Sequence, residues 1–254
     1  MRKALEDRIA IIATGDEIIS GEVANSNAQI IAQELWAACF NLGISMQVSD
    51  AEQDLLSALS WAMAQHRVVI SIGGLGPTLD DRTRFAIATC LRRKLEFNKQ
   101  LWDAINRFRE RRGLRALPDN NRQQAMLIPG SQILTNHNGT AAGFLICEQK
   151  NIIVALPGPP RECLPIFYEQ VLPRLLAEIN PTQQHRKLWT LINQSESYVA
   201  SLVEPLVANL DVELGFRVHK PLLDVKISSQ DHSAFTSACS AIEDLFAENK
   251  INIR

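Results

Sequence analysis

Glycines and acidic residues stand together where an apolar run ends. The stretch SIGGLGPTLDD, residues 71–81, follows directly on RVVI. Glycine lets a ligand approach the main chain closely, and a glycine-rich turn leading into a helix presents several N–H groups to one anion. Asp80 and Asp81 would repel that anion unless a divalent cation lay between, because hard cations bind carboxylate oxygens. We interpret the stretch as a metal–phosphate site; the alternative is a plain turn with one aspartate as a helix N-cap.

Two earlier loops repeat this arrangement of acids after apolar runs. TGDE (14–17) brings Asp16 and Glu17 just past the run 8–15, and Asp50 ends the run 44–50. These acids could bind a metal or a ribose, whereas helix capping and, for Asp50, a turn are the alternatives. If the runs are parallel strands, the three loops meet at one sheet edge, which is where open α/β sheets bind ligands.

Two later loops could form further walls of the same pocket. NHNGTAAGF (136–144) offers backbone amides together with Asn138 and Thr140, and ALPGPPREC (155–163) offers a rigid turn and Arg161. A plain turn and a rigid strand–helix connection are the respective alternatives. None of the five histidines pairs at metal-ligand spacing. His137 stands out among them because it lies in a candidate pocket loop.

Apolar runs that alternate with helical patterns predict β-α-β units. The predicted strands are 8–15, 44–50 and 67–74, and helices follow each of them. Gly43 is expected to end the first helix, whose apolar residues are Ile31, Leu35, Ala38 and Leu42. This pattern predicts an α/β fold in three layers, with a mostly parallel sheet covered by helices on both faces.

The rest of the chain predicts a bent helix, a hairpin and a second, smaller domain. Residues 98–127 are expected to be helical and rich in arginine, and we interpret the arginines as a solvated face rather than a nucleotide-binding one. Strands are expected at 133–136, 143–148 and 151–158, and the last two should form a hairpin. A helix is expected at 160–179, bent or interrupted by Pro165 and Pro173. The expected domains are 1–178 and 186–254, and the second is a small α+β unit.

Composition excludes several classes of protein. The 254 residues carry a net charge of −2, which gives no sign of a general polyanion binder. Five scattered cysteines predict free thiols in a reducing compartment, and no apolar run is long enough to span a membrane. We therefore expect a cytoplasmic protein without membrane partners. Gly215 is the one glycine after residue 185, so a GXXG loop for nucleic acid is lacking there.

Five motifs occur in an order that resembles one known family. They are TGDEIISGEVANSN (14–27), GGLGPTLDDRT (73–83), NNRQQAMLIPG (120–130), NHNGTAAGF (136–144) and LPGPPREC (156–163). Together they resemble the N-terminal domain of the CinA family, which is related to the molybdopterin-binding fold of MogA and MoeA. The resemblance covers residues 5–178, and the remainder resembles the KH-type domain of CinA proteins.

The resemblance implies an αβα domain that forms homodimers or higher homo-oligomers and acts on a small nucleotide. It implies divalent-metal-dependent hydrolysis of ADP-ribose to AMP and ribose 5-phosphate, with Mg²⁺, Mn²⁺ or Co²⁺ as the cofactor. Full-length members also deamidate nicotinamide mononucleotide, and this chain ends too early to hold that domain. The alternatives are molybdopterin binding or adenylylation, and a nucleotide-binding module without turnover.

Residue by residue, Asp81, Asp50 and Asp80 would be catalytic, and Asp81, Asp50 and Asp16 would bind the metal. Asn25 and Ser26 stand where the family usually has Asp-Thr, and Ala142 replaces a usual proline. The expected substrate-binding residues are Thr14, Gly15, Asp16, Glu17, Gly73, Gly74, Gly76, Pro77, Thr78, Thr83, Asn138, Gly139, Thr140, Gly158, Pro159 and Arg161.

Overall fold

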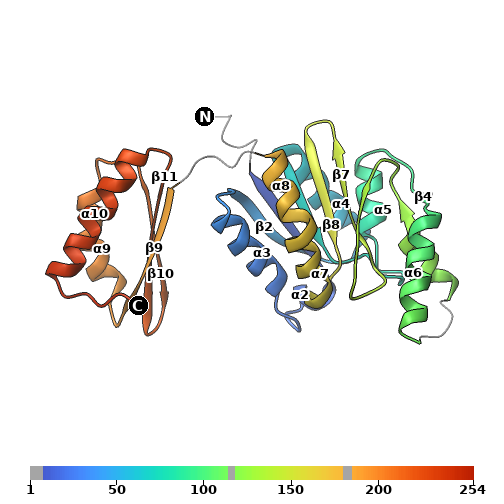
Figure 1. The fold of residues 1–254 in the computed structure, drawn as a ribbon, viewed down its shortest axis with the longest axis horizontal. Helices are drawn as coiled ribbons and strands as arrows, with labels where there is room; N and C mark the ends of the chain where they lie inside the picture. The colour runs from blue at the N-terminus through green and yellow to red at the C-terminus, as the bar shows by residue number, and fades with distance from the viewer. Residues whose placement is uncertain (1–7, 114–117, 180–184) are drawn as a thin grey trace. The chain divides into compact units, whose positions relative to one another are not determined.

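The computed structural model describes residues 8–113, 118–179 and 185–254. The chain divides into two compact units, residues 1–180 and 181–254 (Figure 1). The elements of the first unit are β1 (Ile9–Thr14), α2 (Asp16–Ile19), α3 (Ser26–Ala37), β2 (Leu42–Val48), α4 (Glu52–Gln65), β3 (Val68–Ile72), α5 (Thr83–Cys90), β4 (Glu96–Phe97), α6 (Lys99–Arg111), the 3₁₀ helix η1 (Asp119–Ala125), β5 (Met126–Leu127), β6 (Gln132–Leu134), β7 (Gly143–Glu148), β8 (Asn151–Leu156), α7 (Pro160–Ile166), the π turn η2 (Phe167–Val171) and α8 (Leu172–Glu178).

The first unit is built on a six-stranded sheet with the order β2-β1-β3-β8-β7-β6. The first four strands are parallel, and β7 and β6 run antiparallel to their neighbours. The mostly parallel α/β sheet is thus confirmed, as is the hairpin, in which Glu148 lies opposite Asn151. Because β1, β2, β3 and β8 are parallel, the loops that follow them leave the sheet at the same edge.

Two apolar cores, one on each face of the sheet, make the three layers visible in Figure 1. Strand residues alternate between the faces, as Ile12 and Ile11 of β1 illustrate. Ile12 joins a core with α4, α5 and α6, and Ile11 joins a core with α3, α7 and α8. The central strands are buried on both sides, which explains why β1 and β3 read as continuous apolar runs.

The first long helix ends earlier than the expected stop at Gly43. α3 ends at Ala37, and Cys39 takes a left-handed conformation with φ 62°. The amide of Phe40 then donates to the carbonyl of Leu35 at 2.9 Å, which closes a Schellman-type end without glycine. Gly43 lies inside β2, so its expected role was wrong.

The expected helix over 98–127 was also wrong in its extent. α6 ends at Arg111, and Gly113 follows with φ 63°, a conformation that favours glycine and stops helices. Residues 119–125 form η1 instead, and part of the segment, 114–117, lies outside the described residues. The expected helix over 160–179 forms as three consecutive helical segments, α7, η2 and α8, and the π turn η2 lies between Pro165 and Pro173.

The second unit is a small α+β structure with its own core. It contains β9 (His185–Ile192), α9 (Glu196–Val207), β10 (Glu213–His219), β11 (Leu222–Ser229) and α10 (His232–Glu248). The antiparallel sheet has the order β10-β11-β9, and residues such as Val225 and Trp189 pack against both helices. Across both units, the helices of the described residues are too short or too polar to cross a bilayer.

Candidate functional site

A cavity of about 420 Å³ lies at the sheet edge where the loops after β1, β2, β3 and β8 meet. This volume lies within the usual range of small-molecule sites. The structure therefore brings together the loops that the sequence predicted to converge. The predicted residues that line the cavity are Thr14, Gly15, Glu17, Asp50, Gly73, Gly74, Gly76, Pro77, Asp80, Asp81, Thr140, Gly158 and Pro159.

Five carboxylates line this cavity, which we call the acidic cavity. They are Glu17, Asp50, Asp80, Asp81 and Glu162, and the described lining residues include no lysine, arginine or histidine. An anionic ligand would be repelled by such a wall unless a cation accompanied it. The cavity therefore suits either a cation or an anion that arrives with one.

The carboxylate of Asp81 holds the glycine loop in place by accepting hydrogen bonds from it. Its oxygens accept hydrogen bonds from the amide of Gly76 at 2.7 Å and from the amide and hydroxyl of Thr78 at 2.8 and 2.5 Å. This corrects the expectation that Gly76 and Thr78 donate to phosphate, because their donors are already used. It also excludes Asp81 as the N-cap of α5, a position that Arg82 occupies.

Side chains from the NNRQQ motif hold the same loop through its carbonyls. Gln123 Nε2 donates to the carbonyls of Gly76 and Thr78 at 3.1 and 2.8 Å, and Asn120 Nδ2 donates to that of Pro77 at 3.1 Å. The loop is thus fixed on both sides. The motif carries part of the family resemblance, and its run of amide side chains was the available signal for this role.

Two amides of the glycine loop remain available for a ligand. Gly73 donates its amide to the carbonyl of Leu156 at 2.9 Å. The amides of Gly74 and Leu75 have no hydrogen-bond partner within the described residues, and both residues line the acidic cavity. These two N–H groups are the donors that a bound phosphate would meet first.

Thr83 and Arg84 lie beneath the loop rather than in the cavity. Both are fully buried, and Thr83 Oγ1 packs against Gly74. Thr83 was expected to bind the substrate, but in this position it cannot reach a ligand in the acidic cavity. Arg84 Nη1 donates to the carbonyl of Gln123 at 3.2 Å. Burial lowers the pKa of Arg84 to about 10, which leaves the guanidinium charged at neutral pH, and the charge of Asp81 opposes that lowering.

Asp16 and Asp50 connect the first two loops. Each donates its amide to the carboxylate of the other at 3.1 Å, and Thr14 Oγ1 donates to Asp50 at 2.9 Å. Asp50 lines the acidic cavity, whereas Asp16 does not. Asp16 therefore positions Asp50 in this arrangement.

The remaining predicted residues are spread around the rim. Asn138 Nδ2 donates to the carbonyl of Arg161 at 2.9 Å, and neither residue lines the acidic cavity. Gly139 also lies outside it, beside a second cavity. Asn25, at the departure from the family pattern, accepts the amide of Ala28 and so performs the N-capping that aspartate would perform.

Two residues of the site were missed by sequence reasoning. Asn27 is buried and donates to the carbonyl of Gly158 at 2.6 Å, and its Oδ1 has no partner among the residues that the structure describes. Glu162 lines the acidic cavity and accepts a hydrogen bond from Asn136 at 2.7 Å. Neither residue stands at a spacing that indicates a binding site. From the sequence alone, both could be interpreted only as residues in the first turn of a helix.

The carboxylates fit a hard divalent cation in chemical type, since all are oxygen donors. Within the described ranges, no three His, Cys, Asp or Glu side chains gather closely enough to hold an ion as they stand. Asp80 is exposed at the rim of the acidic cavity, so its side chain can change rotamer.

Comparisons with known proteins place this geometry in a family. Residues 10–177 match the family described as "Probable molybdopterin binding domain". A putative competence-damage inducible protein of Thermoanaerobacter pseudethanolicus is 34% identical over 222 residues, which are 87% of this chain and 53% of the relative. A CinA-like protein of Dictyoglomus thermophilum is 33% identical over 200 residues, 79% of this chain and 48% of the relative. The chain spans about half the length of these curated relatives.

A solved structure supports the same assignment. The crystal structure of the protein CinA from Thermoplasma acidophilum, described as of unknown function, is 27% identical and has a TM-score of 0.58. The match covers 64% of this chain and 95% of the CinA chain in that crystal structure. The expected molybdopterin-binding-like αβα fold is thereby confirmed. The chain belongs to the family of CinA-like, competence-damage inducible proteins and carries a molybdopterin-binding-type domain over residues 10–177.

Proposed function

We propose that the acidic cavity hydrolyses the diphosphate of a nucleotide such as ADP-ribose with the help of a divalent cation. The observation that carries the proposal is the wall of five carboxylates beside two unpartnered loop amides. Amides at a glycine loop favour phosphate, and carboxylates favour a cation. Both preferences are met together by a diphosphate that binds through a metal ion.

Asp50 and Asp80 would hold the ion, with Asp81 contributing any lone pair that its loop bonds leave free. Asp16 would keep Asp50 in place through the paired hydrogen bonds between them. The ion, when bound, would polarise the phosphate oxygens and lower the pKa of a bound water.

The chain's own residues would bind and orient the diphosphate. The amides of Gly74 and Leu75 would donate to its oxygens, and the bonds from Asp81 and Gln123 would keep those amides aimed at them. In the reaction, the oxygen of a water molecule bonds to one phosphorus. The bridging P–O bond breaks, so AMP and ribose 5-phosphate leave, and the water's protons pass to the products and solvent.

The test is hydrolysis of ADP-ribose by the purified protein, followed by chromatography with Mg²⁺, Mn²⁺, Co²⁺ or EDTA. AMP should appear with a divalent ion and not with EDTA, and Asp80→Asn should lower the rate while leaving the fold intact. Absence of AMP with every ion in a folded sample would refute hydrolysis of this substrate.

The family match favours a second candidate, binding or adenylylation of molybdopterin. Adenylylation would consume ATP and release diphosphate, whereas hydrolysis of ADP-ribose consumes no ATP. Release of diphosphate from ATP only when molybdopterin is added would therefore identify the second function.

A further inference from the structure

A second cavity of about 220 Å³ lies between α6 and the loop that follows β6. Its apolar wall comes from α6 residues such as Ile105 and Phe108, and its rim carries Arg107, Arg111 and His137. We call it the basic cavity. Thr140 lines both cavities, so the two are neighbours that share one residue.

The charges of the two cavities are opposite. The described residues that line the basic cavity include no aspartate or glutamate, whereas five acids line the acidic cavity. Arg107 and Arg111 have no ion-pair partner among the described residues, although Arg109 on the same helix pairs with Glu110 at 3.3 Å. Two guanidinium groups one helical turn apart thus face a cavity whose described lining residues carry no acid, since Glu162, which bonds to Asn136 in its wall, lines the acidic cavity instead.

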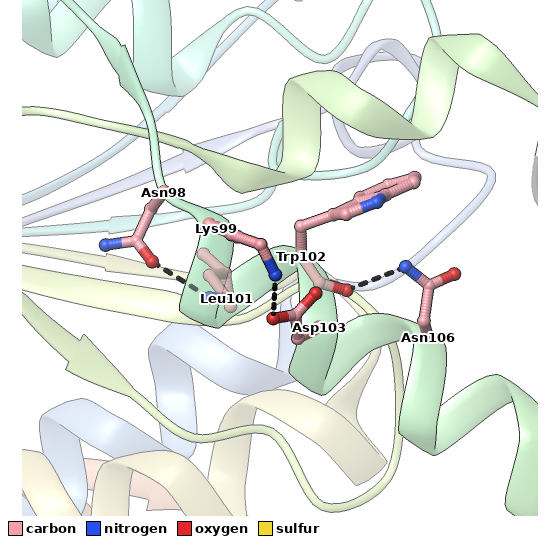
Figure 2. Close-up of polar contacts among 6 residues, drawn as sticks. All are labelled: Asn98, Lys99, Leu101, Trp102, Asp103 and Asn106. Carbon is pink, nitrogen blue, oxygen red and sulfur yellow. Dashed lines mark hydrogen bonds and ion pairs between the residues drawn. The ribbon is translucent and has the colours of Figure 1, made fainter.

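The walls of the basic cavity are held in place before any ligand binds. Asn98 caps the N-terminus of α6 by accepting the amide of Leu101 at 2.9 Å, and Lys99 pairs with Asp103 at 2.7 Å (Figure 2). Figure 2 also shows Asn106 Nδ2 donating to the carbonyl of Trp102 at 3.0 Å. These contacts lie in the first turns of α6 and leave its arginine-bearing end free to meet a ligand.

The opposite wall is equally well fixed. Gln170 donates to the carbonyl of Thr135 at 2.8 Å and accepts its amide at 2.7 Å. Asn136 donates to Glu162 at 2.7 Å and to the carbonyl of Ala141 at 2.9 Å. His137 follows directly on these two residues and is exposed at the cavity rim.

We propose that the basic cavity is a subsite for a phosphomonoester group of the same ligand whose diphosphate lies in the acidic cavity. A phosphate dianion matches two guanidinium groups and an imidazole, which together offer more donors than a carboxylate can accept. The link between the cavities rests on the proposed function. The binding of phosphate in the basic cavity does not, because it needs no metal and no turnover.

The first experiment titrates inorganic phosphate into the protein in EDTA, at constant pH and ionic strength, and follows the ring signals of His137 by NMR. Without a cation, the acidic cavity repels phosphate, so a saturable shift reports on the basic cavity. Arg107→Gln combined with Arg111→Gln should weaken the half-saturation about tenfold. Arg92→Gln is the matched control and should change nothing, because Arg92 is exposed and its side chain has no contact among the described residues.

His137→Gln identifies the ring signal by its disappearance, and acetate replaces phosphate as the carboxylate probe. An unmoved His137 signal, an equal response to acetate, or an unchanged titration in the arginine double variant would each overturn the phosphate subsite. Both arginines are exposed, and each single variant repeats the test if the double variant does not fold.

The second experiment tests the link to the acidic cavity. With a divalent ion, 2′-phosphorylated ADP-ribose should give a kcat/KM about tenfold above that of ADP-ribose, and the arginine double variant should lose this preference. Hydrolysis without any preference would overturn the link. If neither compound is hydrolysed while phosphate still shifts His137, the proposed function fails and the phosphate subsite stands.

Discussion

The backbone amides of Asp16 and Asp50 each donate to the side-chain carboxylate of the other, both at 3.1 Å. The pair ties the end of β1 to the end of β2, at the edge of the sheet where the acidic cavity opens. Asp50 lines the acidic cavity, and Asp16 holds Asp50 in place. The same contact therefore stabilises the fold and positions a residue of the site.

Replacing Asp50 by alanine is expected to destabilise the protein. The amide of Asp16 would lose its acceptor, and the hydroxyl of Thr14 would keep only the more distant of its two, the carbonyl of Ser49 at 3.3 Å. Partly exposed hydrogen bonds of this kind contribute about 1–2 kcal/mol together to the free energy of unfolding. Urea denaturation measures the loss. Asp103→Ala removes an exposed ion pair with Lys99 and is the control, with an expected cost of about 0.5 kcal/mol or less. Equal costs for both variants would contradict the bonding described for Asp50.

Asp80 and Asp81 are neighbours with different expected roles, and asparagine substitutions separate them. Asp81→Asn puts an amide donor where Thr78 and Gly76 also donate, so the free energy of unfolding should fall by about 1–3 kcal/mol. Asp80→Asn should leave the stability within about 0.5 kcal/mol, because the residue is exposed. Both variants should lower the rate of metal-dependent hydrolysis of ADP-ribose, for different reasons.

Urea denaturation beside the hydrolysis assay distinguishes those reasons. If Asp81→Asn kept the stability of the parent, the carboxylate would not be holding the loop. If Asp80→Asn kept the full rate at every concentration of metal ion, Asp80 would not be an ion ligand.

Burial raises the pKa of the Cys163 thiol to about 12, and this shift predicts a loss of stability in alkali. An unfolded cysteine ionises near pH 9, whereas the folded thiol stays protonated until about pH 12. Between these values the folded state binds more protons, so the free energy of unfolding falls as the pH rises. The loss between pH 9 and 10.5 is about 1.6 kcal/mol from this group alone, because the unfolded thiol is only half ionised at pH 9.

Comparison with Cys163→Ala isolates that contribution, because every other titrating group is shared. The parent should lose about 1.6 kcal/mol more than the variant when urea denaturation is repeated at pH 9 and 10.5. The variant is expected to be less stable at neutral pH, since a buried side chain is shortened. Parallel losses in both proteins would mean that the thiol is not protected from solvent.

The sequence predicted the sheet and the meeting of its loops because apolar runs and helical periods are local patterns. It could not predict how the donors of the glycine loop are used, since that depends on Asp81 and Gln123 folding back onto it. The end of α3 was missed for a related reason. Cys39 adopts a left-handed conformation that glycine usually takes, and the hydrogen bond from the Phe40 amide to the Leu35 carbonyl holds the chain there. Periodicity indicates which elements form, whereas contacts between loops depend on the tertiary fold.

The close packing of Gly74 on Thr83 allows one further test of the loop. Gly74 has φ 65°, and a Cβ there would meet Thr83 Oγ1. Gly74→Ala should therefore cost more than Gly130→Ala, since Gly130 has φ 88° but open space around it. Left-handed backbone strain accounts for about 1–2 kcal/mol in either variant, and the collision adds to it only at Gly74.

Removing the Thr83 hydroxyl separates strain from collision. In a Thr83→Ala background, Gly74→Ala should cost less than in the parent but still more than Gly130→Ala, because the closest contact, with Thr83 Oγ1, is removed while Cβ and N of residue 83 stay at 3.1 and 3.2 Å from the added Cβ. Thermal unfolding of the four proteins of this cycle, with Gly130→Ala beside them, gives the coupling between the two residues. If the two substitutions were additive, the loop would be free to move away from Thr83. The Gly74 amide would then have no fixed position, and the proposed phosphate contact, which depends on that position, would be contradicted.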